Sequence, residues 1–194
     1  MLEFGHHDHI LREHEVGDLQ MRIGLVNSHD AKNAVGIFGR MLRTWCANQA
    51  TVEEQMFGDA TFRHTLDMTQ VRDSVYQYVK NIPPLGDKID FYRSIATPEQ
   101  TQLDFAHEAL AIRWGDAAPI DEKALLTVRR EKDTLSNLWG LYQIVQENLT
   151  KGGHDYQAEG KRRNKTRAIS SIDSDLQING KLWTLMTAFA AARE

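Results

Sequence analysis

Histidine and acidic residues are concentrated near the start of the sequence, in the stretch FGHHDHILREHE at residues 4–15. Neutral imidazole is a common ligand for transition metals, and carboxylates can complete a coordination shell. His6, His9 and His14, with Glu13, could therefore bind zinc or nickel. A defined site also needs a second layer of side chains to hold its ligands in place. Because little chain precedes this stretch to supply that layer, a solvated polar arm is the simpler interpretation.

Further histidines and acids follow along the chain: Glu53 and Glu54 in QATVEEQMF, His64 in FRHTLD and His107 in FAHEAL. With His9 before them, this series resembles the hemerythrin-like proteins, which are helical bundles that hold two irons with histidines and acids from four helices. The resemblance implies a metal-binding bundle that uses these residues. The sequence departs from the family's hallmark at Gln49, where the family has a histidine four residues before the first glutamate. We expect no cofactor, with iron or zinc as the alternative.

A basic segment, GKRRNKTR, occupies residues 160–167 and contains no acid. Its cations are Lys161, Arg162, Arg163, Lys165 and Arg167. Such a block can neutralise phosphates, and each contact adds salt-dependent affinity through counterion release. No aromatic residue lies between the cations, so base stacking is not indicated. The segment predicts contact with nucleic acid or with an acidic partner, unless it is simply a solvated loop.

Covalent catalysis has no clear candidate in this sequence. Cys46 lies on an apolar stripe, where a buried thiol is unreactive. The sequence has no GxSxG motif, phosphate-binding loop or dinucleotide fingerprint. These observations favour a role other than catalysis.

Composition is that of an ordinary globular protein, with 194 residues, 41% hydrophobic and 26% charged. The net charge of −4 gives no overall attraction to polyanions, so any such contact must be local. One cysteine fits a reducing compartment. No apolar run is long enough to span a membrane, and no signal peptide is apparent. We therefore expect a cytoplasmic protein without membrane contacts.

Apolar periodicity predicts a mainly α fold, a single bundle of about five to six helices with one short N-terminal strand or extended arm. Leu19, Met21, Ile23 and Leu25 alternate with other residues, which indicates a strand, and no partner strand is evident. Spacings of three to four residues predict helices. The first helix is expected from Ser28 to about Cys46, a short one after the capping box at 51–54, and a third that ends at the prolines at 83–84. A fourth is expected from the TPEQ start signal at 97–100 to Gly115, and two more over about 120–150 and about 171–192.

The expected organisation is a His-rich arm at 1–27, a helical bundle at 28–151, a basic loop at 152–170 and a C-terminal helix at 171–194 that packs on the bundle. The unpartnered strand and the long helix would offer surfaces to another chain. We therefore expect a non-catalytic interaction protein, a subunit or adaptor of a larger cytoplasmic assembly or a homo-oligomer. The alternatives are a nucleic-acid-binding subunit that uses residues 161–167 and a metal-binding bundle.

Overall fold

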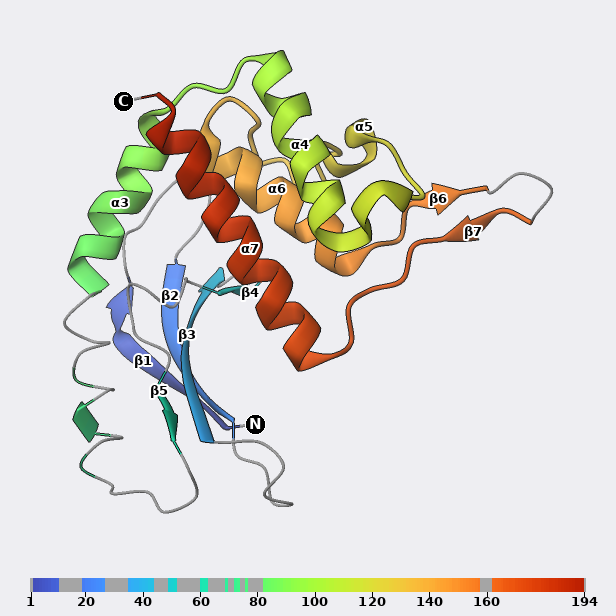
Figure 1. Ribbon diagram of the computed structural model, residues 1–194. Helices are drawn as coiled ribbons and strands as arrows, with labels where there is room; N and C mark the ends of the chain where they lie inside the picture. Colours follow the sequence, from blue (N-terminus) through green and yellow to red (C-terminus); the bar gives the residue numbers. More distant parts are fainter. Residues whose placement is uncertain are drawn as a thin grey trace. The chain divides into compact units, whose positions relative to one another are not determined.

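The computed structural model describes residues 2–10, 19–26, 35–43, 49–51, 60–62, 69, 72–73, 76, 82–157 and 162–193. The chain divides into two compact units, residues 1–88 and 89–194. The first holds a five-stranded antiparallel sheet, and the second holds most of the described helices (Figure 1).

The sheet of the first unit is built around its third strand. Its strands are β1 (Leu2–Ile10), β2 (Leu19–Val26), β3 (Val35–Arg43), β4 (Gln49–Thr51) and β5 (Ala60–Phe62). β2 pairs with β1 on one side and with β3 on the other. β4 and β5 both pair with β3, at opposite ends of it. The strand predicted from the alternation at residues 19–25 is therefore confirmed, whereas the expectation that it lacks a partner is wrong.

The helix predicted from Ser28 is also wrong, because residues 35–43 form strand β3. Its apolar residues fit helical spacing, but Gly36 and Gly39 each cost about 1 kcal/mol in a helix relative to alanine. Along β3, eight consecutive residues pair with β2, from Gly36 opposite Val26 to Arg43 opposite Leu19. This pairing is between two consecutive strands, and the spacing of apolar residues within either one does not reveal it. The helix expected after the capping box at 51–54 falls on residues 52–59, which lie outside the described residues, and Thr51, its expected cap, ends β4.

The second unit confirms the mainly α prediction. Across residues 82–193 the described helices are α3 (Ile82–Ser94), α4 (Glu99–Trp114), the short 3-10 turn η1 (Gly115–Ala117), α5 (Glu122–Leu125), α6 (Leu138–Lys151) and α7 (Ile172–Ala191). The strands described there are the short pair β6 (Asp155–Tyr156) and β7 (Asn164–Lys165). Among the described helices, none is long and apolar enough to cross a membrane.

Residues 69, 72, 73 and 76 are helical, as predicted, and residues 77–81, where that helix was expected to end, lie outside the described residues. Prolines 83 and 84 lie in the first turn of the next described helix, α3. A proline is tolerated there because the first backbone N–H groups of a helix have no intrahelical partner. The helix expected over about 120–150 is interrupted, and only α5 and α6 form. Asn137 starts α6 by accepting a hydrogen bond from Gly140 N, and the charged segment RREKD at 129–133 lies in the loop between them.

α6 is the central helix of the second unit, and every residue from Leu138 to Leu149 is buried. Aromatic rings of α6, α3 and α7 pack against one another beside it. Trp183 of α7 is fully buried and packs edge-on against Trp139, Tyr142 and Tyr92, at centroid distances of 6.4, 6.0 and 6.0 Å. Burial raises the pKa of the Tyr142 phenol, as expected for a dry interior. The C-terminal helix is therefore part of the core, as its apolar stripe predicts.

Trp183→Ala should lower the free energy of unfolding by about 3 to 5 kcal/mol, because it removes a ring that contacts three other aromatic side chains. Urea denaturation followed by far-UV circular dichroism measures this change. Lys181→Ala, at an exposed position of the same helix, should change stability by less than about 0.5 kcal/mol. Equal effects of the two substitutions would contradict the assignment of α7 to the core.

Candidate functional site

The basic segment of the sequence forms one side of a two-stranded antiparallel ribbon. In this ribbon Asp155 lies opposite Lys165, and Tyr156 lies opposite Asn164. Figure 1 shows β6 and β7 extending as an arm from the helices of the second unit. Residues 158–161, between the two sides, lie outside the described residues, and Lys161 is among them.

The ribbon begins directly at the C-terminal end of α6. Gly152 ends the helix with φ of 61°, a conformation that favours glycine. A Cβ atom at this position would lie only 2.7 Å from the backbone oxygens of Thr166 and Arg167. Backbone bonds then join the two sides of the ribbon, from Gly153 N to Thr166 O at 2.8 Å and from Thr166 N to His154 O at 2.9 Å. Glycine at 152 therefore lets the returning chain approach the helix end closely.

Two arginines from outside the ribbon hold its base. Arg113 of α4 donates hydrogen bonds to the backbone oxygens of Leu149 and Arg167. These bonds join the end of α6 to the segment that follows β7. Arg129 donates from Nε to Asn148 Oδ1 and from Nη2 to Gly152 O, each at 2.5 Å. These guanidinium groups satisfy carbonyl oxygens that a helix leaves without partners at its C-terminal end.

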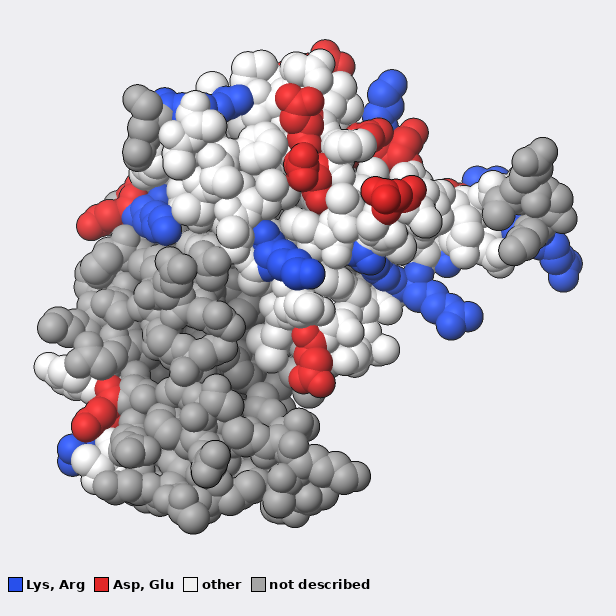
Figure 2. Space-filling view, viewed as in Figure 1, with Lys and Arg blue, Asp and Glu red and all other residues white. Residues whose placement is uncertain are grey.

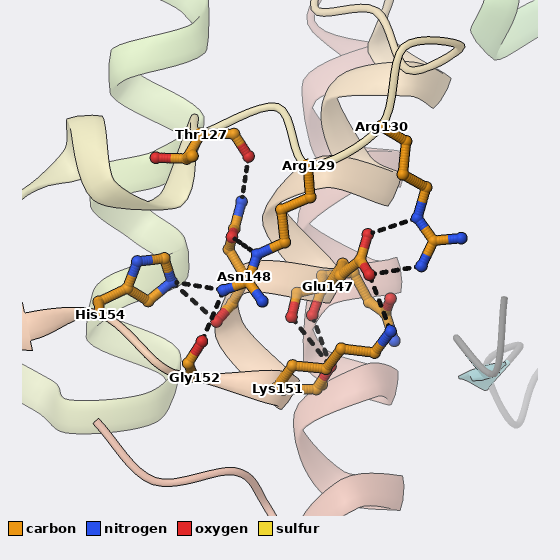
Figure 3. A network of polar contacts seen from close by, with 10 residues as sticks. Thr127, Arg129, Arg130, Glu147, Asn148, Lys151, Gly152 and His154 are labelled. Carbon is orange, nitrogen blue, oxygen red and sulfur yellow. Dashed lines mark hydrogen bonds and ion pairs between the residues drawn. The ribbon is translucent and has the colours of Figure 1, made fainter. Parts of the chain in front are cut away.

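Asn148 connects this network to the preceding helix (Figure 3). Its side chain is fully buried, and its Nδ2 donates to Leu125 O at 2.9 Å and to Thr127 O at 2.8 Å. His154 Nε2 lies 3.3 Å from Asn148 O and 3.3 Å from Arg129 Nη2. Burial lowers the pKa of His154, and the positive charge of Arg129 lowers it further. The imidazole is therefore neutral at physiological pH and belongs to the structural base of the ribbon.

Glu147 forms a second cluster beside the first, also visible in Figure 3. Its side chain is only 4% exposed, and its Oε1 lies 2.6 Å from Arg130 Nη2 and 2.8 Å from Lys151 Nζ. Burial opposes ionisation, but the hydrogen bonds from Arg130 and Lys151 outweigh it and hold the pKa of Glu147 below its ordinary value. This cluster ties the loop before α6 to the last turns of the helix.

The remaining cations of the ribbon face solvent. Arg162, Arg163, Lys165 and Arg167 are exposed, and Figure 2 shows Lys and Arg side chains both above and below the arm. Arg163 Nη2 lies 3.0 Å from Asp155 Oδ2 across the ribbon, with side chains 72% and 42% exposed. Among the described residues, no ion pair reaches the side chain of Arg162, Lys165 or Arg167.

The residues considered as metal ligands are not assembled in the described part of the chain. His107 is exposed, and its Nδ1 lies 2.8 Å from Glu122 Oε1, a hydrogen bond that raises the pKa of the imidazole. His6 and His9 belong to β1, whereas His14, Glu53, Glu54 and His64 lie outside the described residues. Within the described ranges, no group of three or more His, Cys, Asp or Glu could hold a metal ion.

Sequence reasoning missed the residues that support the ribbon. Arg113 and Arg129 carried no signal, because each lies in a different predicted helix and far from the basic segment in sequence. Asp155 and Tyr156 were missed because they precede the basic block at 160–167, whose own residues include no acid and no aromatic side chain. The glycine pair after α6, Gly152 and Gly153, is the sequence signal for the turn at which the chain leaves the helix.

Comparison with known proteins assigns the chain to a family. The sequence pattern of the family described as Domain of unknown function (DUF932) matches residues 6–183, so the protein belongs to this family. The UPF0380 protein YfjQ of Escherichia coli K12 is 33% identical over 186 residues, which cover 93% of this chain and 68% of the relative. The UPF0380 protein YafZ of the same organism is 32% identical over 189 residues, covering 94% and 69%. No solved structure matches the chain.

Glu147→Gln should lower the free energy of unfolding by about 1.5 to 3 kcal/mol at neutral pH, because it removes charge-assisted hydrogen bonds from two cations. Since the pKa of this carboxyl lies below its ordinary 4.5, its contribution is present above that pH and is lost as the pH falls through the lowered value. The stabilities of parent and variant should therefore converge in acid.

Chemical denaturation over a pH series measures this convergence. Glu131→Gln, at an exposed position of the loop before α6, is the matched control and should have little effect at any pH. A difference between parent and Glu147→Gln that stays constant down to strongly acidic pH would contradict the role assigned to the ionised carboxylate.

Proposed function

We propose that the protein binds nucleic acid through the basic ribbon at residues 153–167. The observation that carries this proposal is the exposure of Arg162, Lys165 and Arg167 on a projecting arm without acidic partners among the described residues. Lys and Arg side chains in such a position can neutralise backbone phosphates, and the release of condensed counterions then drives association. A two-stranded ribbon is one of the elements that proteins place against nucleic acid.

The division of the cations supports the same conclusion. Arg113, Arg129 and Arg130 are engaged with carbonyl oxygens or with Glu147. The ribbon cations have one described acidic partner, Asp155, which pairs with Arg163 at the surface. An exposed ion pair of this type contributes little to stability, generally below about 1 kcal/mol. The ribbon cations therefore have little structural role, which favours a role in binding.

The sequence first predicted an interaction subunit, and the structure differs from two of the expectations on which that prediction was based. The strand at 19–26 has partners on both sides, and the long helix is interrupted. The exposed basic ribbon is thus the strongest feature for recognition in the second unit. The other possible partner of the ribbon is an acidic protein surface, and binding measurements with nucleic acid distinguish the two partners.

Replacing Arg162, Arg163 and Lys165 together with glutamine should weaken binding to a polynucleotide and reduce its salt dependence. The slope of log affinity against log salt should fall by about 2 to 3, because each lost phosphate contact to duplex DNA removes about 0.9. Fluorescence anisotropy over a salt series measures both quantities. Far-UV circular dichroism should be unchanged, since these side chains are exposed.

The matched control replaces Lys123, Lys132 and Lys181, all exposed, with glutamine, which changes the net charge equally at other sites. It should keep most of the affinity. Asp155→Asn should instead strengthen binding, because it releases Arg163 from its carboxylate. The proposal is contradicted if the parent shows no binding at low salt, or if the two triple variants lose affinity equally.

A further inference from the structure

The two faces of the ribbon carry different side chains, and the backbone register identifies them. Asp155 and Lys165 are directly opposite each other, and Arg163 reaches Asp155 diagonally across the ribbon at 3.0 Å. These three residues therefore share one face. Tyr156 and Asn164 form the neighbouring pair, one residue farther from α6 on each strand, and belong to the other face.

Arg162 extends the positive charge to the second face. Successive side chains of an extended segment point to opposite sides, and Arg163 is held on the Asp155 face by its ion pair. Arg162, its neighbour in sequence, is exposed and lies two residues before the start of β7; continuing the alternation of the strand places it on the side of Asn164. The ribbon thus presents Arg163 and Lys165 on one side and Arg162 on the other.

From this distribution we propose that the ribbon binds double-stranded DNA by lying in its major groove; this inference rests on the proposed function. Paired strands are separated by about 4.8 Å, so a two-stranded ribbon with its side chains fits a groove about 12 Å wide. A groove has a line of phosphates on each wall, and cations on both faces of the ribbon can reach both lines. A single strand offers one such line, and the major groove of duplex RNA is too narrow and deep for side chains to read.

The aromatic content of the ribbon supports duplex binding over single-strand binding. Proteins that bind single strands generally stack bases on aromatic side chains along a basic groove. Residues 152–167 contain one Phe, Tyr or Trp, namely Tyr156, and the imidazole of His154 belongs to the base of the ribbon. Tyr156 is half-buried and lies opposite Asn164, in the strand pair farther from α6 than Asp155 and Lys165. One partly covered ring does not form a platform for successive bases.

Competition binding with the full chain tests the proposal. A short labelled DNA duplex is displaced by the same duplex unlabelled, by each of its separated strands and by the corresponding RNA duplex. The DNA duplex should compete at about tenfold lower nucleotide concentration than the other competitors, corresponding to roughly one additional charge-assisted contact. Arg162→Gln and Lys165→Gln should each weaken duplex binding, because they lie on different faces, whereas Tyr156→Leu should change it by less than about twofold.

The outcomes separate this inference from the proposed function. If a separated strand or the RNA duplex competes as well as the DNA duplex, the duplex DNA assignment is overturned while ribbon-dependent binding stands. That assignment is also overturned if Tyr156→Leu weakens binding by about fivefold or more, the range expected for a stacked base. If Arg162→Gln has no effect while Lys165→Gln does, contact from both faces is overturned. If none of the variants alters binding, the proposed function itself fails.

Discussion

The C-terminal end of α6 is the point on which the arrangement of the ribbon depends. A helix ends with carbonyl oxygens that lack intrahelical partners and with a partial negative charge. Here Arg113 and Arg129 donate to those oxygens, and Lys151 pairs with the buried Glu147. Because Arg113 also donates to the backbone of Arg167, the same cation that completes the helix end fixes the chain returning from the arm. The hydrogen bonds of one arginine therefore both complete the helix end and orient the ribbon.

This arrangement divides the cations near the end of α6 into two groups. The arginines at the base contact carbonyl groups or Glu147 and have a structural role, whereas the cations of the arm are exposed. A net charge of −4 gives the whole chain no general attraction to polyanions. Concentrating exposed cations on a projecting arm gives the local positive potential that the proposed phosphate binding requires, while a base held by hydrogen bonds would limit the conformational entropy lost on binding.

Segments with a clear periodic pattern of their own were predictable, and a strand whose apolar residues also fit helical spacing was not. The helix at 172–191 followed from its apolar stripe and its start at Ser171, and the strand at 19–26 followed from its alternation. Strand β3 was assigned to a helix because its stability comes from pairing with β2, which no local pattern reports. The basic segment identified the candidate site, but not its ribbon form. That form requires Gly152 to admit the returning chain and Arg113 to hold it, two residues that are 39 positions apart along the chain.

Lysine footprinting of the full chain with and without duplex DNA tests the central claim most directly. An amine-selective acetylating reagent modifies exposed lysines, and mass spectrometry quantifies each site. Lys165 lies on the ribbon, while Lys123 and Lys181 are also exposed, on helices of the same unit. We predict that DNA protects Lys165 from acetylation and leaves Lys123 and Lys181 unchanged, with the protection lost at high salt. Protection of Lys123 or Lys181 with Lys165 still fully reactive would contradict the account.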